Sequence, residues 1–277
     1  MTVLTLTALL FVGSLVAGFL GSLTGMGGGV VIVPLLTIFM GVDLRYAVGA
    51  SLVSVIATSS AAAAAYVKDG YTNIRIGMFL EGATTMGAMA GAVLAAFVPV
   101  SAISIVFGLV LVWSAYLSTR HREESTVSEL PDRLATWLRL DSTYPTPSGP
   151  QAYHVRGVPG GYAIMFVAGI LSGLLGIGSG ALKVLAMDQI MRLPFKVSTT
   201  TSNFMIGVTA AAGAGVYLNR GYVDPTLSMP VMLGVLVGAL IGAKVLVGAK
   251  PRVLRIIFAV VLVVLGGQMI YHGLTGG

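Results

Sequence analysis

The feature that most constrains this chain is a series of long stretches with almost no charge. They cover residues 3–23, 47–67, 76–98, 100–117, 162–182, 197–218, 226–243 and 256–271. A transmembrane helix needs about 20 consecutive apolar residues, and most of these stretches approach that length. Only 9% of the residues are charged, whereas a soluble domain carries about 25%. The stretches lack the alternating pattern of an outer-membrane barrel, so we predict a bundle of membrane-spanning helices.

Composition excludes several other classes. The first stretch has no positively charged residues before it and is longer than the apolar core of a signal peptide, which favours an uncleaved transmembrane helix. The formal charge of +6 comes from cations at predicted helix ends and in one polar stretch, so it indicates membrane orientation rather than nucleic-acid binding. The chain has no cysteine, which excludes disulfides, thiolate metal sites and cysteine nucleophiles.

The sequence repeats itself after a shift of 151 residues. Gly18 falls on Gly169, Ser51 on Ser202, and 21 of the 82 positions in 17–98 match their partners in 168–249. Internal repeats of this kind are common in secondary transporters. We therefore predict two transmembrane repeats, 1–119 and 162–277, joined by a polar linker at 120–161.

Part of the linker has an amphipathic pattern. Residues 128–140 space their apolar side chains as a helix would: Leu130, Leu134, Trp137 and Leu138. This fits a short helix in the membrane interface. A connecting loop with one or two amphipathic turns is an equal alternative.

Each predicted half begins with an apolar helix, a glycine-rich break and a short apolar run, at 30–40 and again at 181–191. A helix of that length reaches only about 16 Å, half of the hydrocarbon core. We therefore expect helix, break and short run to form one hairpin that is followed by three full spans. The odd number of crossings inverts one half relative to the other. The expected fold is an all-α integral membrane protein of two inverted repeats, with about ten helical segments.

The positive charges agree with this topology. It puts 13 of the 16 Lys and Arg residues on the linker side, Arg45 and Arg220 on the other side, and Lys183 within the membrane. A topology in which the first helix is a full span shows no such bias, so we reject it. Since cytoplasmic loops are rich in Lys and Arg, we expect a cytoplasmic linker and extracytoplasmic termini in the cell membrane.

The two breaks are the main candidates for a binding site. Their residues are Gly25, Gly27, Gly28 and Gly29 in the first half and Gly176, Gly178, Ser179 and Gly180 in the second. Unwound backbone within a membrane is tolerated only where protein or a cavity satisfies its polar groups. The short helix after each break offers N–H groups and a positive dipole end, which suit an anion, and inversion would bring the breaks together. Close helix packing through small residues is the alternative explanation.

Lys183 follows the second break by one turn. An ammonium inside a membrane costs about 3 kcal/mol, so it needs a partner or a water-filled cavity. We expect it to attract an anionic substrate. The alternative is a structural pair with Asp188 or with carbonyl groups at a helix end. The equivalent residue in the first half is Ile32, so the predicted site is asymmetric.

Polar residues in the spans are further candidates. We expect Ser51, Ser202 and Asn203 to line the substrate path, although interhelical hydrogen bonds would also explain them. Glu81 and Asp188 are candidates for proton coupling, but each lies near a predicted helix end. That position favours the membrane interface for both.

Enzyme chemistry finds little support. The segment Gly178-Ser179-Gly180 is faintly similar to the serine motif of intramembrane proteases, yet all three histidines lie in the linker or near the C-terminus. No serine and histidine pair is therefore expected inside the membrane. No metal-ligand cluster appears either. We expect no enzyme activity, no cofactor and no metal.

With the paired breaks in view, the sequence resembles the TauE/SafE sulfite-exporter family of membrane transporters. The similar residues are AGFLGSLTGMGGGVVIVPLL (17–36) and GASLVSVIATS (49–59), with second copies at 168–184 and 199–218. The resemblance covers nearly the whole chain except the linker, which is longer than in compact members. It implies transport of sulfur-containing anions, often outward, and it places the break glycines at the family's motif positions.

We therefore expect a secondary transporter of sulfite or an organosulfonate, with a site between inverted halves and alternating access by rocking. Its partners would be the anion, the lipid bilayer and a coupling ion, H⁺ or Na⁺, and no nucleic acid. Substrate, direction, stoichiometry, oligomeric state and the role of the linker stay open. The alternatives are an anion channel that uses the breaks as a filter and a membrane enzyme or assembly factor without transport activity.

Overall fold

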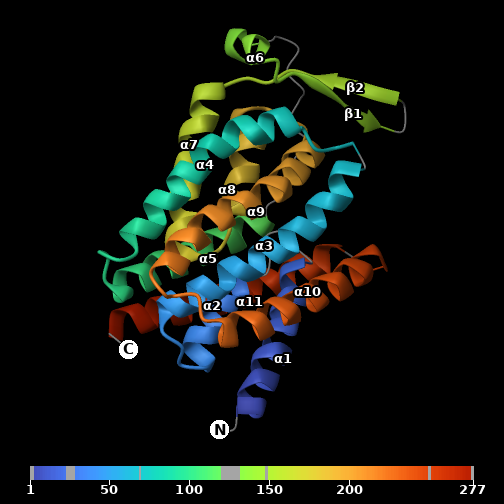
Figure 1. Ribbon diagram of the computed structural model, residues 1–277. Coiled ribbons are helices and arrows are strands. Elements are labelled where there is room, and N and C mark those ends of the chain that lie inside the picture. Colours follow the sequence, from blue (N-terminus) through green and yellow to red (C-terminus); the bar gives the residue numbers. More distant parts are fainter. Residues whose placement is uncertain are drawn as a thin grey trace.

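The computed structural model describes residues 3–22, 29–68, 70–119, 132–146, 149–248 and 251–275. Most of these residues are helical, which confirms the predicted helical class (Figure 1). The first half contains α1 (Val3–Ser22), α2 (Gly29–Pro34), the π-helical η1 (Leu35–Phe39), α3 (Leu44–Lys68), α4 (Ile74–Leu94) and α5 (Val100–Thr119). The second half contains α7 (Val158–Leu175), α8 (Gly180–Leu185), η2 (Ala186–Ile190), α9 (Phe195–Asn219), α10 (Pro225–Gly248) and α11 (Pro251–Thr275).

The two halves present the same elements in the same order. Each short helix after a break, α2 or α8, passes directly into a π-helical segment, and together they match the predicted runs at 30–40 and 181–191 to within one residue. Pro34 ends α2, but the equivalent residue of α8 is Leu185. Proline therefore does not explain the wider turn, which is of a kind often found at functional sites.

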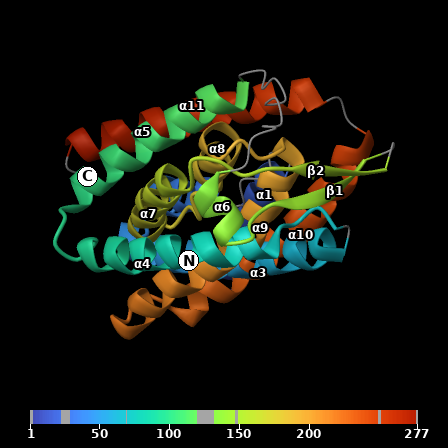
Figure 2. The same cartoon turned by 90° about the horizontal axis from the view of Figure 1, so that it is seen from above.

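Helices from different halves pack in pairs. α1 lies along α10 and α7 along α4, while α3 packs on α9 and α5 on α11. Figure 2 shows α5 and α11 side by side along one edge of the bundle. Exchanging the halves converts the α1–α10 pair into the α7–α4 pair, so the packing itself has an approximate two-fold relation. The halves are interlocked.

Glycines set the closest of these helix crossings. A methyl group added to Gly18 would come within 2.3 Å of the Val235 carbonyl oxygen, and one added to Gly169 within 2.2 Å of that of Thr84. These two contacts are equivalent under the repeat. Helices that pack in a membrane use small residues in this way, because the backbones can then approach closely.

The outer faces of the helices are apolar. Of the described helices, α4 and α7 are long and apolar enough to cross a bilayer, and shorter apolar stretches occur at Thr5–Phe19, Val100–Tyr116, Pro225–Ile241 and Ala259–Thr275. Large apolar side chains are exposed on several helices, among them Val12, Met86, Met89, Leu109, Leu240 and Val264. Exposed apolar surface on this scale needs lipid or a protein partner to cover it.

The linker combines a short helix, within the stretch 128–140, with a β-hairpin. It contains the five-residue helix α6 (Arg133–Trp137) and an antiparallel hairpin of β1 (Ser142–Thr146) and β2 (Gly149–Tyr153). Leu134 and Trp137 are exposed on α6, with Trp137 78% exposed, while Leu130 lies outside the described residues. The hairpin was not predicted. Its signal was the Pro- and Gly-containing stretch between Tyr144 and Gln151, which is typical of a turn.

The linker and the chain termini lie at opposite ends of the bundle. Figure 1 shows α6, β1 and β2 at one end and both N and C at the other, with α1 and α7 running in opposite directions. Lys196 lies over the ring of Tyr71 at the linker end (5.8 Å). Arg45 lies over the ring of Tyr222 at the far end (5.9 Å).

Candidate functional site between the two halves

The two glycine breaks meet in the interior. Ser51 on α3 donates a hydrogen bond to the carbonyl oxygen of Gly176 in the second break (2.8 Å) and lies 3.3 Å from that of Gly29 at the end of the first. Its partner in the repeat, Ser202 on α9, donates to Gly180 (3.3 Å). The Ser51 hydroxyl thus satisfies the carbonyl of Gly176, which follows the last turn of α7 and lacks the partner that a continuing helix would supply. Gly25, Gly27 and Gly28 lie outside the described residues.

The second break is a run of left-handed backbone. Gly176, Gly178 and Ser179 have φ angles of 71°, 69° and 48°. Glycine adopts this region freely, whereas a side chain there is strained, so Ser179 is the exception. Its hydroxyl is buried and has no hydrogen-bond partner. A buried unpaired hydroxyl costs about 1–3 kcal/mol, which makes this position a candidate ligand contact.

The break glycines also pack closely. A methyl group on Gly29 would come within 2.7 Å of Val55, and one on Gly180 within 2.8 Å of Ile206, the equivalent residue. The alternative explanation by helix packing therefore holds for these two glycines. It does not account for the unpaired hydroxyl of Ser179, so packing and binding can share the same break.

Lys183 is fully buried, and a hydroxyl of its own half links it to a carboxylate from the other half of the chain. Its ammonium donates to the hydroxyl of Thr209 on α9 (2.5 Å), and that hydroxyl lies 2.7 Å from Oε1 of Glu81 on α4. Glu81 is 7% exposed and Thr209 is fully buried. We call these three residues the Glu81–Thr209–Lys183 cluster. It joins a cation and a carboxylate through one hydroxyl.

Both candidate proton carriers, Glu81 and Asp188, are buried within the protein. Their position relative to the membrane interface stays a prediction. The start of α4 lies under the linker, where Leu140 and Tyr153 pack in one cluster with Ile76 and Leu80. Asp188 accepts a hydrogen bond from Gln189 (2.7 Å), and Lys183 contacts Thr209 instead of the proposed Asp188 partner.

Comparison with known proteins identifies the family of this chain. The family model for the sulfite exporter TauE/SafE matches residues 10–269. The chain belongs to the TauE/SafE family. It is 29% identical over 273 residues to the probable membrane transporter protein YunE of Bacillus subtilis, covering 96% of this chain and 98% of that one. No solved structure matches it.

Other TauE/SafE relatives carry the same description. The chain is 27% identical over 240 residues to the probable membrane transporter protein YdhB of Bacillus subtilis, covering 85% of this chain and 86% of that one. It is 26% identical over 281 residues to the probable membrane transporter protein MJ0441 of Methanocaldococcus jannaschii, covering 95% of each. This TauE/SafE protein is therefore a multi-pass membrane transporter and not an enzyme.

Sequence reasoning found most of the polar residues in this TauE/SafE core but not their connections. Ser202 and Asn203 are buried on α9, and Ser202 serves the break through its hydrogen bond to Gly180. Thr209 was missed. Its signal was the repeat itself, because Thr209 falls on Thr58 in an otherwise apolar part of the helix.

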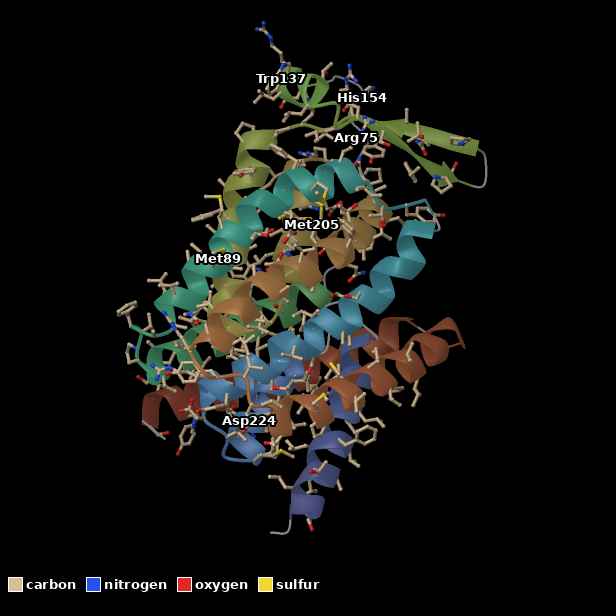
Figure 3. All side chains as sticks on the ribbon, in the orientation of Figure 1. Arg75, Met89, Trp137, His154, Met205 and Asp224 are labelled. Carbon is tan, nitrogen blue, oxygen red and sulfur yellow. The ribbon has the colours of Figure 1, made fainter. Side chains whose placement is uncertain are left out.

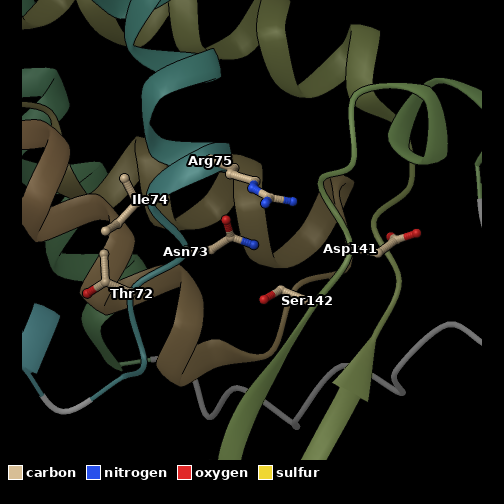
Figure 4. A pocket seen from close by; sticks show the side chains of 6 residues that line it. All are labelled: Thr72, Asn73, Ile74, Arg75, Asp141 and Ser142. Carbon is tan, nitrogen blue, oxygen red and sulfur yellow. The ribbon is translucent and has the colours of Figure 1, made fainter.

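A surface cavity lies elsewhere, at the linker end of the described residues. Its volume is about 340 Å³, and its lining residues are Thr72, Asn73, Ile74, Arg75, Asp141 and Ser142 (Figure 4). Asn73 donates to the carbonyl of Leu140 (3.1 Å) and to the hydroxyl of Tyr153 (2.7 Å), and so fastens the linker to α4. The cavity lies between the linker and the bundle, away from the breaks that carry the TauE/SafE motif.

Proposed function

We propose that this protein is a secondary transporter of a small sulfur-containing anion, sulfite or an organosulfonate. The observation that carries the proposal is the meeting of two glycine breaks between the halves, with the unpaired Ser179 hydroxyl at the start of a helical segment and Lys183 one turn further on. N–H groups and a positive dipole end at such a point favour an anion. Asn203 on the neighbouring helix adds an amide to the substrate path.

The small number of buried charges favours a substrate of low charge. Lys183 is the one cation within the described interior of the bundle, and a strongly hydrated dianion would need more compensation than it provides. The choice of sulfur rests on the family, whose description names sulfite export. A carboxylate would satisfy the same N–H groups and ammonium, so acetate is the necessary comparison.

Alternating access between inverted repeats is the proposed mechanism. It is supported by the antiparallel course of α1 and α7 (Figure 1) and by the equivalent pairing of α1 with α10 and α7 with α4. Two equivalent packings give a fold two related ways to close around a central site. The excess of Lys and Arg at the linker end supports a cytoplasmic position for that end in the cell membrane.

Transport in proteoliposomes tests the function. We expect saturable uptake of labelled sulfite or methanesulfonate that accumulates against a gradient, and competition by the unlabelled anion. Uptake that does not saturate and only follows the electrochemical gradient would indicate a channel. If no anion enters faster than into empty liposomes, the transport proposal is wrong.

A further inference from the structure

The Glu81–Thr209–Lys183 cluster is the one place in the described interior where a carboxylate and an ammonium share a hydroxyl. From this geometry we propose that the cluster couples the anion to a proton. Glu81 is the proton carrier, and Lys183 is the cation that protonation of Glu81 releases for the anion. The inference rests on the proposed function, because it needs a transported anion.

The charge balance of the interior is the first argument. With Glu81 ionised, the cluster holds one negative and one positive charge and is neutral overall. Breaking such a buried pair by removing one charge costs about 3–5 kcal/mol, because the other charge is left without compensation. When Glu81 takes up a proton, the Lys183 ammonium becomes that uncompensated charge. A bound monoanion restores neutrality, so proton and anion stabilise each other.

The hydrogen bonds of Glu81 are the second argument. Oε1 accepts from Thr209 (2.7 Å) and from Thr85 (3.1 Å), whereas Oε2 is buried with no partner. Protonation at Oε2 leaves both existing bonds in place. The free oxygen is therefore the site at which the carboxylate can take up a proton without dismantling the cluster.

The position of Lys183 is the third argument. It belongs to the helical segment that begins at the second break, and its backbone N–H donates to the carbonyl of Ser179 (3.1 Å). One ammonium proton is engaged by Thr209, which leaves the other two as donors for a ligand. A movement of α8 against α9 would separate Lys183 from Thr209 and free its ammonium for an anion at the break.

Among the described residues, the neighbouring elements bring no second cation to Glu81. α9 presents the Thr209 hydroxyl to Glu81, while its Lys196 lies over Tyr71 at the linker end and its Tyr217 hydroxyl contacts Leu174. α7 brings the phenol of Tyr162 beside Gly82, next to Glu81 in the chain. On η2, the carboxylate of Asp188 is bonded to Gln189. Lys183 is the cation that faces Glu81.

The resulting cycle balances in protons and charge. Glu81 takes one proton from the side to which the site is open, the monoanion binds beside Lys183, and the loaded site is electroneutral within the cluster. After the halves rock, the anion leaves, Glu81 releases its proton and the pair with Lys183 forms again. The predicted stoichiometry is one proton per monoanion, moving in the same direction.

Proteoliposomes with an imposed pH gradient and no other ion gradient test this coupling. The probes are sulfite and methanesulfonate, of which the sulfonate stays ionised and does not cross a bilayer as a neutral acid. For each probe that the wild type transports, we expect the anion to accumulate on the alkaline side of the membrane. When the alkaline side is the liposome interior, an internal pH-sensitive dye should report its acidification. Glu81→Gln should lose this accumulation by about tenfold or more but keep exchange of labelled for unlabelled anion, at a rate that no longer depends on pH.

Matched threonine variants separate coupling from folding. Thr209→Val removes the hydroxyl between the charges and should resemble Glu81→Gln, and Thr209→Ser should restore coupling. Thr85→Val removes the other hydroxyl bonded to Glu81 without touching Lys183 and should behave as wild type. Monodisperse elution and the retained exchange establish that each variant is folded.

The outcomes distinguish the coupling from the transport proposal. Accumulation by Glu81→Gln at the wild-type level, accumulation driven by a Na⁺ gradient instead, or equal loss in Thr85→Val and Thr209→Val would each overturn the proton relay and leave the transport function standing. Absence of transport of either probe by the wild type would reject both.

Discussion

Two sets of equivalent positions in this bundle differ in their chemistry. Where α4, α8 and α9 meet, the buried groups are Glu81, Lys183 and Thr209. The equivalent positions on α10, α2 and α3 hold Met232, Ile32 and Thr58. The threonines keep the same backbone contact, since each lies within hydrogen-bond distance of the carbonyl four residues before it. Only the charged partners are missing from one set.

The difference shows which part of the repeat is architectural. Glycine contacts, break carbonyls and helix pairing recur in both halves because both halves need the same packing. A second charge cluster is not needed for that packing, since Ile32 is as fully buried as Lys183. One symmetric scaffold therefore carries one asymmetric site. Figure 3 shows Met205, one turn before Thr209, between the linker end marked by Arg75 and the far end marked by Asp224.

Among the proposed substitutions, the largest loss of stability is expected at the glycine crossings that the two halves share. Gly87 and Gly238 are equivalent, and a methyl group on them would lie 2.2 Å from the Phe166 carbonyl oxygen and 2.0 Å from that of Leu15. Gly87→Val and Gly238→Val should each prevent assembly of the bundle, because neither backbone can yield that far. Monodisperse protein in detergent is the measurement.

The control for this pair is Gly215 on α9, where an added methyl group meets nothing within 4 Å. Gly215→Ala should keep or slightly raise thermal stability, because alanine favours helix by about 1 kcal/mol over glycine. A large difference between Gly87→Val and Gly238→Val would contradict the equivalence of the two crossings.

The next-largest effect on stability is expected when a buried lysine is placed at the equivalent position of the first half. Ile32→Lys places an ammonium opposite Met232 instead of a carboxylate and should destabilise the protein by about 3 kcal/mol. Adding Met232→Glu should recover part of the loss, with a coupling of about 1–3 kcal/mol. Thermal unfolding of the two single variants and the double variant measures it. If Ile32→Lys alone is as stable as wild type, a counter-charge is not what permits Lys183.

A smaller effect separates the two serines of the breaks. Ser51 lies within hydrogen-bond distance of carbonyls from both breaks, whereas Ser202 contacts Gly180 alone at 3.3 Å. Ser51→Ala should therefore cost about 1 kcal/mol and Ser202→Ala less, because a typical buried hydrogen bond contributes on that scale. Thermal unfolding in the same detergent compares them, and a reversed order would show that Ser51 is not the tie between the breaks.

The sequence predicted those features of the site that local signals encode. Uncharged runs marked the helices, and glycines marked the breaks at Gly29 and Gly180, because both effects depend on neighbouring residues alone. Which helices pack against each other could not be predicted from the sequence, because helices such as α1 and α10 are apolar on all sides and no apolar stripe marks the contact face. Glu81 and Lys183 lie more than a hundred residues apart and meet only through Thr209. The interfacial position given to Glu81 stays a prediction, whereas its contact with Thr209 was not predicted.

The smallest effect concerns the residues before α4 and α10, which are also equivalent. Asn73 is buried, and its side chain accepts from the N–H of Ile76. Asp224 is exposed, and it accepts from the N–H and hydroxyl of Thr226 (2.8 and 2.7 Å). These hydrogen bonds hold the pKa of Asp224 below its ordinary value of 3.8. The carboxylate therefore stabilises the fold above that value, and the contribution is lost as pH falls through the lowered pKa.

Asp224→Asn should abolish this small acid-dependent component of thermal stability while leaving stability near neutral pH almost unchanged. Because Asn73 does not ionise, Asn73→Ala should lower stability equally at acid and neutral pH. An Asp224→Asn protein that keeps the full acid dependence of the wild type would show that another carboxylate is responsible.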